Sequence, residues 1–266
     1  MDYSVGHFYE AFALFYAGEW GAMRRRLRLA IDMANRNGHD FWVLLFSLLD
    51  AMLRLETFSS QETHNDCHEY LARARDLGHP LSIQISLALL SKAQLAIGDL
   101  KAAQETFDEI IRWQGGERIL MDWIWRLPLQ FNYVELCMTR GNLDAAVEAS
   151  ELFLSQAART AEKTWTVLAH LARAKIAAIQ QEKKRFERET EAGLELVEVH
   201  NVPLAAWRLH AFMAQTLGSF EHREKALLIV RRLADSLESE SELKQCFLSA
   251  PEVAAVVGSR RQATAN

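Results

Sequence analysis

The chain has 266 residues, a formal net charge of −5 and only three cysteines. These values exclude a strongly basic nucleic-acid-binding protein and a dense disulfide framework. Half of the residues are hydrophobic, which allows a sizeable core, whereas 12 glycines and four prolines are too few for a loop-rich or β-sandwich fold. Because Ala, Leu, Glu, Arg and Gln favour helices, the composition predicts an all-α protein.

The cysteines, the first residues and the most apolar stretch indicate where in the cell the protein resides. Cys67, Cys137 and Cys246 are odd in number and far apart, which fits a reducing cytoplasm. The first residues, MDYSVGHFYEAF, lack the basic and apolar regions of a secretory signal. The most apolar stretch, Phe41 to Leu55, is interrupted by Asp50 and is too short to span a membrane. We therefore expect a cytoplasmic protein without a membrane partner.

Apolar residues at helical spacing, bounded by Gly, Asn, Pro or polar breaks, predict twelve helices in sequence. In chain order they are Ser4 to Ala17, Trp20 to Asn37, Phe41 to Leu55, Glu62 to Leu77, Leu81 to Ile97, Leu100 to Trp113, Arg118 to Thr139, Leu143 to Ala158, Lys163 to Gln180, Lys184 to Val199, Leu204 to Leu217 and Phe220 to Leu237.

Several positions interrupt this pattern. Gln114-Gly115-Gly116 predicts a loop, and Pro128 should either kink the seventh helix or mark its true beginning. A last helix is expected from Glu242 to Val257, with Pro251 as a bend. We predict one helical-repeat domain over residues 1–258 and a frayed polar tail over 259–266.

The first helix of each pair has a small residue seven positions before the turn, and this position recurs along the chain. Its steps are 40, 40, 43, 40 and 37 residues. The turns begin Gly-Glu, Gly-Asp, Gly-Asn, Gln-Glu and Gly-Ser in pairs one, three, four, five and six, whereas pair two lacks this signature. The recurring residues are Ala11, Ala51, Ser91, Val134, Ala174 and Ala211.

The second helix of each pair has a matching inward stripe, with a three-residue slip in the sixth pair. A single helix pair cannot bury its apolar stripe, but stacked neighbours can. The sequence therefore predicts a right-handed α-solenoid of about six antiparallel pairs with a C-terminal capping helix. The stripes are Met23-Leu27-Ala30, Cys67-Leu71-Ala74, Ala103-Phe107-Ile110, Ala146-Ser150-Phe153, Phe186-Thr190-Gly193 and Ala226-Val230-Leu233.

Some of these repeats resemble a known family. AIGDLKAAQETFDEII and TRGNLDAAVEASELFL resemble the second half of a tetratricopeptide repeat, and Trp207 and Ala211 resemble aromatic and small positions of its first helix. The longer period is similar to the helical region of maltose-activator-type (MalT-like) regulators and of bacterial signalling ATPases with cyclase domains. The tail LADSLESESELKQCFLSAPEVAAVV is similar to the C-terminal end of the latter group. The resemblance implies a TPR-like binding array.

Motifs for catalysis are not found. The sequence contains no GxxxxGK[S/T], GxGxxG or GxSxG, so we expect no enzyme activity and no cofactor. His64, Cys67 and His68 have ligand-like spacing but no second ligand pair, and Cys67 falls on a core stripe, so no metal site is predicted. His170 and His210 have no acid partner fixed by sequence and are interpreted as structural.

First helices of similar arrays line a concave groove. The residue after each small position should face this groove or its edge, which places Lys92, Glu135, Lys175 and Phe212 there, together with Phe12 and Met52. Arg208 lies one turn before Phe212 and joins them. Trp123, Trp125, Trp165 and Trp207 recur near first-helix starts, where core packing is the simpler interpretation and ligand stacking the alternative.

A groove of mixed charge with apolar ends suits a protein or peptide segment. We therefore predict a non-enzymatic scaffold, the sensor or interaction arm of a bacterial signalling or regulatory system. The alternative is a regulatory module that responds to a small molecule in the groove. Net acidity and the lack of a basic stripe argue against nucleic acid as a partner. The oligomeric state is left open.

Overall fold

The structure is a computed structural model that describes residues 3–113 and 122–258. Within these ranges the chain forms fourteen α-helices and no strand. They are α1 (Tyr3–Ala17), α2 (Trp20–Arg36), α3 (Asp40–Glu56), α4 (Ser60–Asp76), α5 (Pro80–Ala96), α6 (Leu100–Trp113), α7 (Trp123–Thr139), α8 (Leu143–Ala157), α9 (Thr164–Ile179), α10 (Lys183–Val199), α11 (Pro203–Leu217), α12 (Phe220–Ser236), α13 (Ser241–Ser249) and α14 (Pro251–Gly258).

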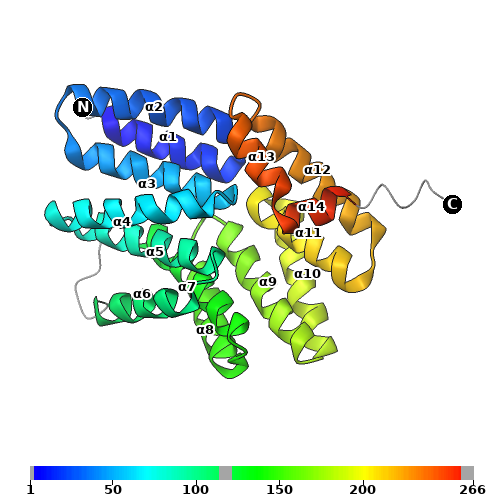
Figure 1. The fold of residues 1–266 in the computed structure, drawn as a ribbon. Helices are drawn as coiled ribbons and strands as arrows, with labels where there is room; N and C mark the ends of the chain where they lie inside the picture. Colours follow the sequence, from blue (N-terminus) through cyan, green and yellow to red (C-terminus); the bar gives the residue numbers. More distant parts are fainter. Residues whose placement is uncertain (1–2, 114–121, 259–266) are drawn as a thin grey trace.

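Consecutive helices form adjacent pairs, and the pairs stack along the chain (Figure 1). The odd-numbered helices from α1 to α11 pack on one another as an inner layer, and each even-numbered helix packs on its odd-numbered neighbours. This arrangement confirms the predicted all-α helical-repeat solenoid. It follows from helices that each bear one apolar stripe and can bury it only against the next pair.

The repeat positions lie where the spacing predicts, at the contacts between helices. Five of the six small residues are fully buried, and the stripe positions of the even-numbered helices are buried with one exception. The two departures are Ala211 on α11 and Phe186 on α10, both only half-buried. They lie on neighbouring helices, α10 and α11, which pack on each other less extensively than α4 packs on α5.

The turns within pairs share a residue with left-handed backbone. Gly98 has φ 82° and Gly141 has φ 72°, as expected for a helix ended by glycine. Pair two, whose sequence lacks the signature, keeps this geometry through Phe58 at φ 64°. In pair five Gln181 takes the position at φ 60°. The turn is therefore imposed by the packing of the pairs even where no glycine favours it.

Replacing Gln181 with glycine should stabilise the protein. A non-glycine residue in the left-handed region costs roughly 1 kcal/mol, and Gln181 is exposed, so little packing would be lost. We expect Gln181→Gly to raise the free energy of unfolding by about 0.5–1 kcal/mol in urea denaturation. Gln180→Gly, one residue earlier at φ −78°, is the control and should lower it. Equal effects of the two changes would contradict the assigned turn.

Two prolines decide how the predicted elements end or continue. Pro128 lies inside α7, which excludes the alternative that it marks the beginning of that helix. The expected last helix is instead two helices, because Ala250 is extended at ψ 134° and Pro251 begins α14. A residue before proline avoids the helical region, which explains the break. The predicted loop at 114–116, the start of the seventh helix at 118–121 and the tail at 259–266 lie outside the described residues.

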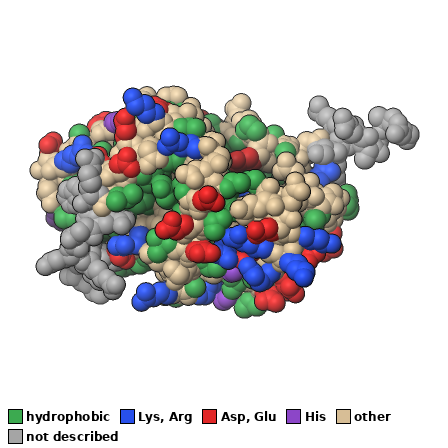
Figure 2. Space-filling view, turned by 90° about the horizontal axis from the view of Figure 1, so that it is seen from below, with side chains coloured by type: hydrophobic (Ala, Val, Ile, Leu, Met, Phe, Trp, Pro, Cys, Tyr) green, Lys and Arg blue, Asp and Glu red, His purple; other side chains and the backbone are tan. Residues whose placement is uncertain are grey.

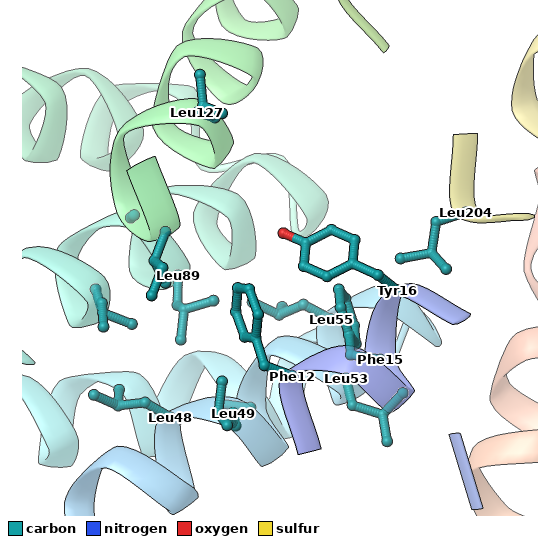
Figure 3. Close-up of a cluster of buried hydrophobic side chains, with 14 of the residues drawn as sticks. Phe12, Phe15, Tyr16, Leu48, Leu49, Leu53, Leu55, Leu89, Leu127 and Leu204 are labelled. Carbon is teal, nitrogen blue, oxygen red and sulfur yellow. The ribbon is translucent and has the colours of Figure 1, made fainter. Parts of the chain in front are cut away.

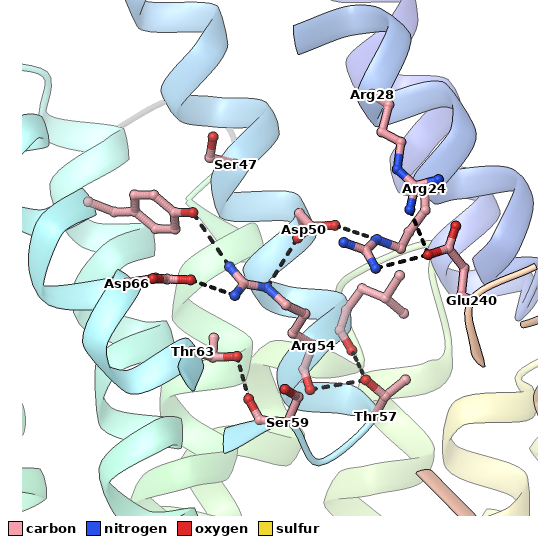
Figure 4. Close-up of polar contacts among 12 residues, drawn as sticks. Arg24, Arg28, Ser47, Asp50, Arg54, Thr57, Ser59, Thr63, Asp66 and Glu240 are labelled. Carbon is pink, nitrogen blue, oxygen red and sulfur yellow. Dashed lines mark hydrogen bonds and ion pairs between the residues drawn. The ribbon is translucent and has the colours of Figure 1, made fainter. Parts of the chain in front are cut away.

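The first and last pairs of the array meet. Trp20 of α2 is fully buried; its backbone N–H donates to Ser236 Oγ at 3.3 Å and its ring lies edge-on to Phe247 of α13, with centroids 5.2 Å apart. Arg24 and Arg28 both contact the buried carboxylate of Glu240, just before α13, as Figure 4 shows. The solenoid is therefore closed by contacts between residues more than 200 positions apart.

The ion pairs at this junction continue into the array. Asp50 of α3 accepts from Arg24 at 2.9 Å and pairs with Arg54, which in turn contacts Asp66 of α4 (Figure 4). These contacts link the C-terminal segment to the first two pairs. Beneath them, large apolar side chains from α1, α3, α5, α7 and α11 pack in a common core (Figure 3).

Among residues 3–113 and 122–258, no helix combines the length and the apolar character that a membrane span needs.

Candidate functional site

Two of the residues predicted to line the concave groove contact the same buried carboxylate. Lys92 of α5 and Arg208 of α11 both pair with Glu56 at the end of α3, with Lys92 Nζ 3.1 Å from Glu56 Oε2. Burial alone would raise the pKa of Glu56, but the Arg208 guanidinium and the Lys92 ammonium outweigh it and hold the pKa below its usual value. The two cations therefore compensate an interior charge.

The other predicted residues are also engaged within the chain. Glu135 of α7 accepts from Lys175 of α9 at 3.0 Å, and Phe212 packs against Phe186 with ring centroids 6.0 Å apart. These five of the seven residues predicted at the groove or its edge thus form three separate sets of contacts. Four of them carry charges that are paired within the array. Phe212 instead contacts Phe186, which lines a different surface.

That surface is a groove of about 800 Å³ between α10 and α11, closed at one end by the last turn of α9. The two helices approach closely at Gly193, where an added Cβ would lie 3.0 Å from Leu209. Elsewhere α10 touches α11 much less than α4 touches α5. The half-buried positions Phe186 and Ala211 lie on these two separated helices.

The groove has an apolar floor and an acidic rim. Phe186, Leu194, Met213 and Leu217 supply large apolar side chains, and Leu217 is 56% exposed. Four glutamates along α10 share the rim with a single lysine, Lys183. The glutamates are Glu187, Glu191, Glu195 and Glu198.

The rim is only partly neutralised. Lys183 pairs with Glu187 at 3.7 Å, whereas neither Glu191 nor Glu195 has an ion-pair partner in the described part of the chain. Both are exposed. On the face shown in Figure 2, acidic and basic side chains are interspersed with hydrophobic ones. Glu191 and Glu195 therefore leave uncompensated negative charge beside the apolar side chains of the groove.

The ligand-like residues of α4 are not assembled into a metal site. Cys67 is fully buried on the core stripe, and burial raises the pKa of its thiol to about 12. His64 and His68 contact each other, with 3.3 Å between their Nε2 atoms. No group of three or more His, Cys, Asp or Glu side chains suited to a metal ion occurs among the described residues.

The remaining candidates of the sequence pack within the protein. His170 Nδ1 lies 2.9 Å from Glu189 Oε2, and Arg173 and Arg188 contact the same buried carboxylate, so α9 and α10 are joined by a charged cluster. Sequence spacing gave no acid partner for His170 because this one belongs to the next helix. Trp125, Trp165 and Trp207 are buried, which supports their interpretation as core residues.

His210 of α11 is buried beside His222 of α12, with 2.9 Å between the two Nδ1 atoms. Burial first, then the positive character of His222 and Lys225, lower the pKa of His210 to about 4, while Glu221 acts in the opposite sense. The unfolded chain therefore binds more protons than the native protein between about pH 6.5 and pH 4. Stability contributed by neutral His210 is present above this window and is lost as the pH falls through it.

We expect the free energy of unfolding to fall by roughly 1–3 kcal/mol more in wild type than in His210→Gln between about pH 7 and about pH 4.5. Urea denaturation at the two pH values measures this difference. His200→Gln, at an exposed position at the end of α10, should retain the wild-type pH dependence. The same pH dependence in all three proteins would contradict the assignment.

The chain was compared with protein-family models, with curated proteins and with solved structures, and none of the three comparisons finds a match. The groove must therefore be interpreted from its own residues. The sequence does contain a signal for it, namely glutamates three or four residues apart from Glu187 to Glu198, which places them on one face of a helix.

Proposed function

We propose that this chain is a non-enzymatic helical-repeat scaffold that binds a protein or peptide segment. The observation that carries the proposal is the groove between α10 and α11, where large apolar side chains remain accessible in an array that elsewhere buries its repeat positions. Exposed apolar surface rimmed by polar residues is typical of protein interaction sites.

The shape of the groove favours a chain segment over a metabolite. The stretch of α10 that lines it, Lys183 to Glu198, extends for roughly 22 Å at the helical rise per residue. Small-molecule sites usually enclose most of the ligand, whereas helical segments bind along grooves of this length. The resemblance to TPR-like and MalT-like arrays extends the proposal to the interaction arm of a regulatory system.

Selection of displayed peptides against the purified chain tests this function. We expect peptides that bind saturably and lose affinity roughly tenfold or more when Leu217 is changed to Asp. Because Leu217 is largely exposed, the change should leave the fold intact. A metabolite that raises the melting temperature in the absence of any selectable peptide would instead support the small-molecule regulatory module.

A further inference from the structure

We propose that the groove between α10 and α11 binds a basic amphipathic helix, with its apolar stripe on the groove floor and its Lys or Arg residues facing the glutamates of α10. This inference rests on the proposed function and specifies the chemistry of the partner. The charge and the geometry of the groove support it separately.

The lining of the groove carries an excess of negative charge. Four glutamates and one lysine face the groove, and the lysine pairs with Glu187. Lys225 on α12 contributes positive charge near Glu198 but pairs with Glu221 at 2.7 Å. Glu191 and Glu195 thus remain without an ion-pair partner in the described chain. Like charges one helical turn apart repel each other, so a bound cation would relieve this repulsion.

The geometry of the groove suits a helical partner. The groove is lined by α10 and α11, and its apolar residues Phe186 and Leu194 are eight residues apart on α10, on the same face. Binding by β-strand addition needs an open sheet edge, and the described residues form no strand. A helix satisfies its own backbone hydrogen bonds and presents side chains at the spacing of this floor.

Bound length and affinity follow from these dimensions. A helix of about 15 residues would span the groove from Lys183 to Glu198. The acidic row would speed association and set the orientation, and the apolar floor would supply most of the affinity. Binding should therefore weaken with salt but not vanish.

The test uses the full chain and a labelled peptide of about 15 residues with leucine at every third or fourth position and lysine on the flanks. Its two control peptides are a scramble without an apolar stripe and a version with glutamate in place of lysine. We expect saturable binding of the basic amphipathic peptide alone, measured by fluorescence anisotropy. Equal binding of the acidic version would overturn the charge assignment, and equal binding of the scramble would overturn the helix assignment.

Matched protein variants locate the site. Glu191→Lys with Glu195→Lys should weaken binding roughly tenfold or more, because two rim charges are reversed. Glu148→Lys with Glu151→Lys changes the net charge identically on exposed positions of α8 and should leave the affinity within about twofold. Equal affinity of both double variants would overturn the proposal, as would a concentration-dependent dimer that only the α10 variant loses, since a second copy of the chain would then occupy the groove.

Failure of this inference can be told apart from failure of the proposed function. If displayed peptides of another chemistry bind and are lost in Leu217→Asp, the basic helix is wrong and the scaffold function stands. If no displayed peptide and no designed peptide binds, both proposals are overturned. Melting curves of each variant show whether the fold has been retained.

Discussion

Replacing both Lys92 and Arg208 with methionine should cost about 3–5 kcal/mol of the free energy of unfolding. The double change leaves the Glu56 carboxylate buried, with 6% of the residue exposed and both ion-pair partners removed. Breaking a buried pair from one side is costly because an uncompensated charge stays in the interior. Urea denaturation monitored by circular dichroism measures the loss.

Removing the carboxylate as well should reverse most of this loss. We expect the triple variant, with Glu56→Gln added, to be more stable than the double variant by at least about 2 kcal/mol, since no buried charge is then left unpaired. The pair Glu135 and Lys175 is the control: it is about one-third exposed on both sides, so Lys175→Met should cost less than about 1 kcal/mol. Equal losses at the two sites would contradict the role of Glu56.

Gly21→Ala should strongly destabilise the protein by separating the two ends of the array. A Cβ at this position would lie 2.2 Å from the backbone carbonyl oxygen of Ser236 on α12, so one of the helices must shift. Inserting an atom into such packing typically costs about 1–3 kcal/mol and sometimes more, and a backbone neighbour that cannot rotate away puts the cost at the upper end.

The sign of this effect makes the experiment decisive. Alanine in place of glycine inside a helix normally stabilises by about 0.5–1 kcal/mol. Gly6→Ala on α1, where a Cβ would meet nothing within 4 Å, should show that ordinary gain. If Gly21→Ala were also stabilising, α2 and α12 could not be packed as described.

The sequence predicted the repeat well because its signal is local. Small residues near every fortieth position and apolar stripes at helical spacing are imposed by contacts within a pair and with the next pair. The helix bounds agree with the structure to within about two residues for most elements. The prediction of a bend at Pro251 was wrong. Ala250, the residue before this proline, is extended and separates two helices.

Features that depend on distant parts of the chain were not predictable in this way. No spacing rule joins Arg208 to Glu56, or Trp20 to Phe247, because the curvature that brings them together accumulates over the whole array. The position after a small residue predicts Lys92, Glu135, Lys175 and Phe212 at the concave face, and Arg208 joins them one helical turn before Phe212, but this spacing does not identify their partners. Their partners come from neighbouring or distant helices and pair their charges inside the protein.

The groove between α10 and α11 is also hard to predict from local sequence patterns. Phe186 occupies an ordinary stripe position, and nothing in its own helix shows that α11 will lie too far away to bury it. Only the row of glutamates on α10 marks that face in the sequence. A partner-binding surface in such an array can therefore lie where the regular packing between repeats is relaxed.

The most direct test of where the partner binds is amide hydrogen exchange of the full chain with and without the basic amphipathic peptide. Binding in the proposed groove predicts slower exchange in α10 and in the C-terminal half of α11, with α5 and α7 unchanged. Slower exchange around Lys92 and Glu135, without any change in α10, would place the peptide at the residues predicted to line a concave groove and contradict the account.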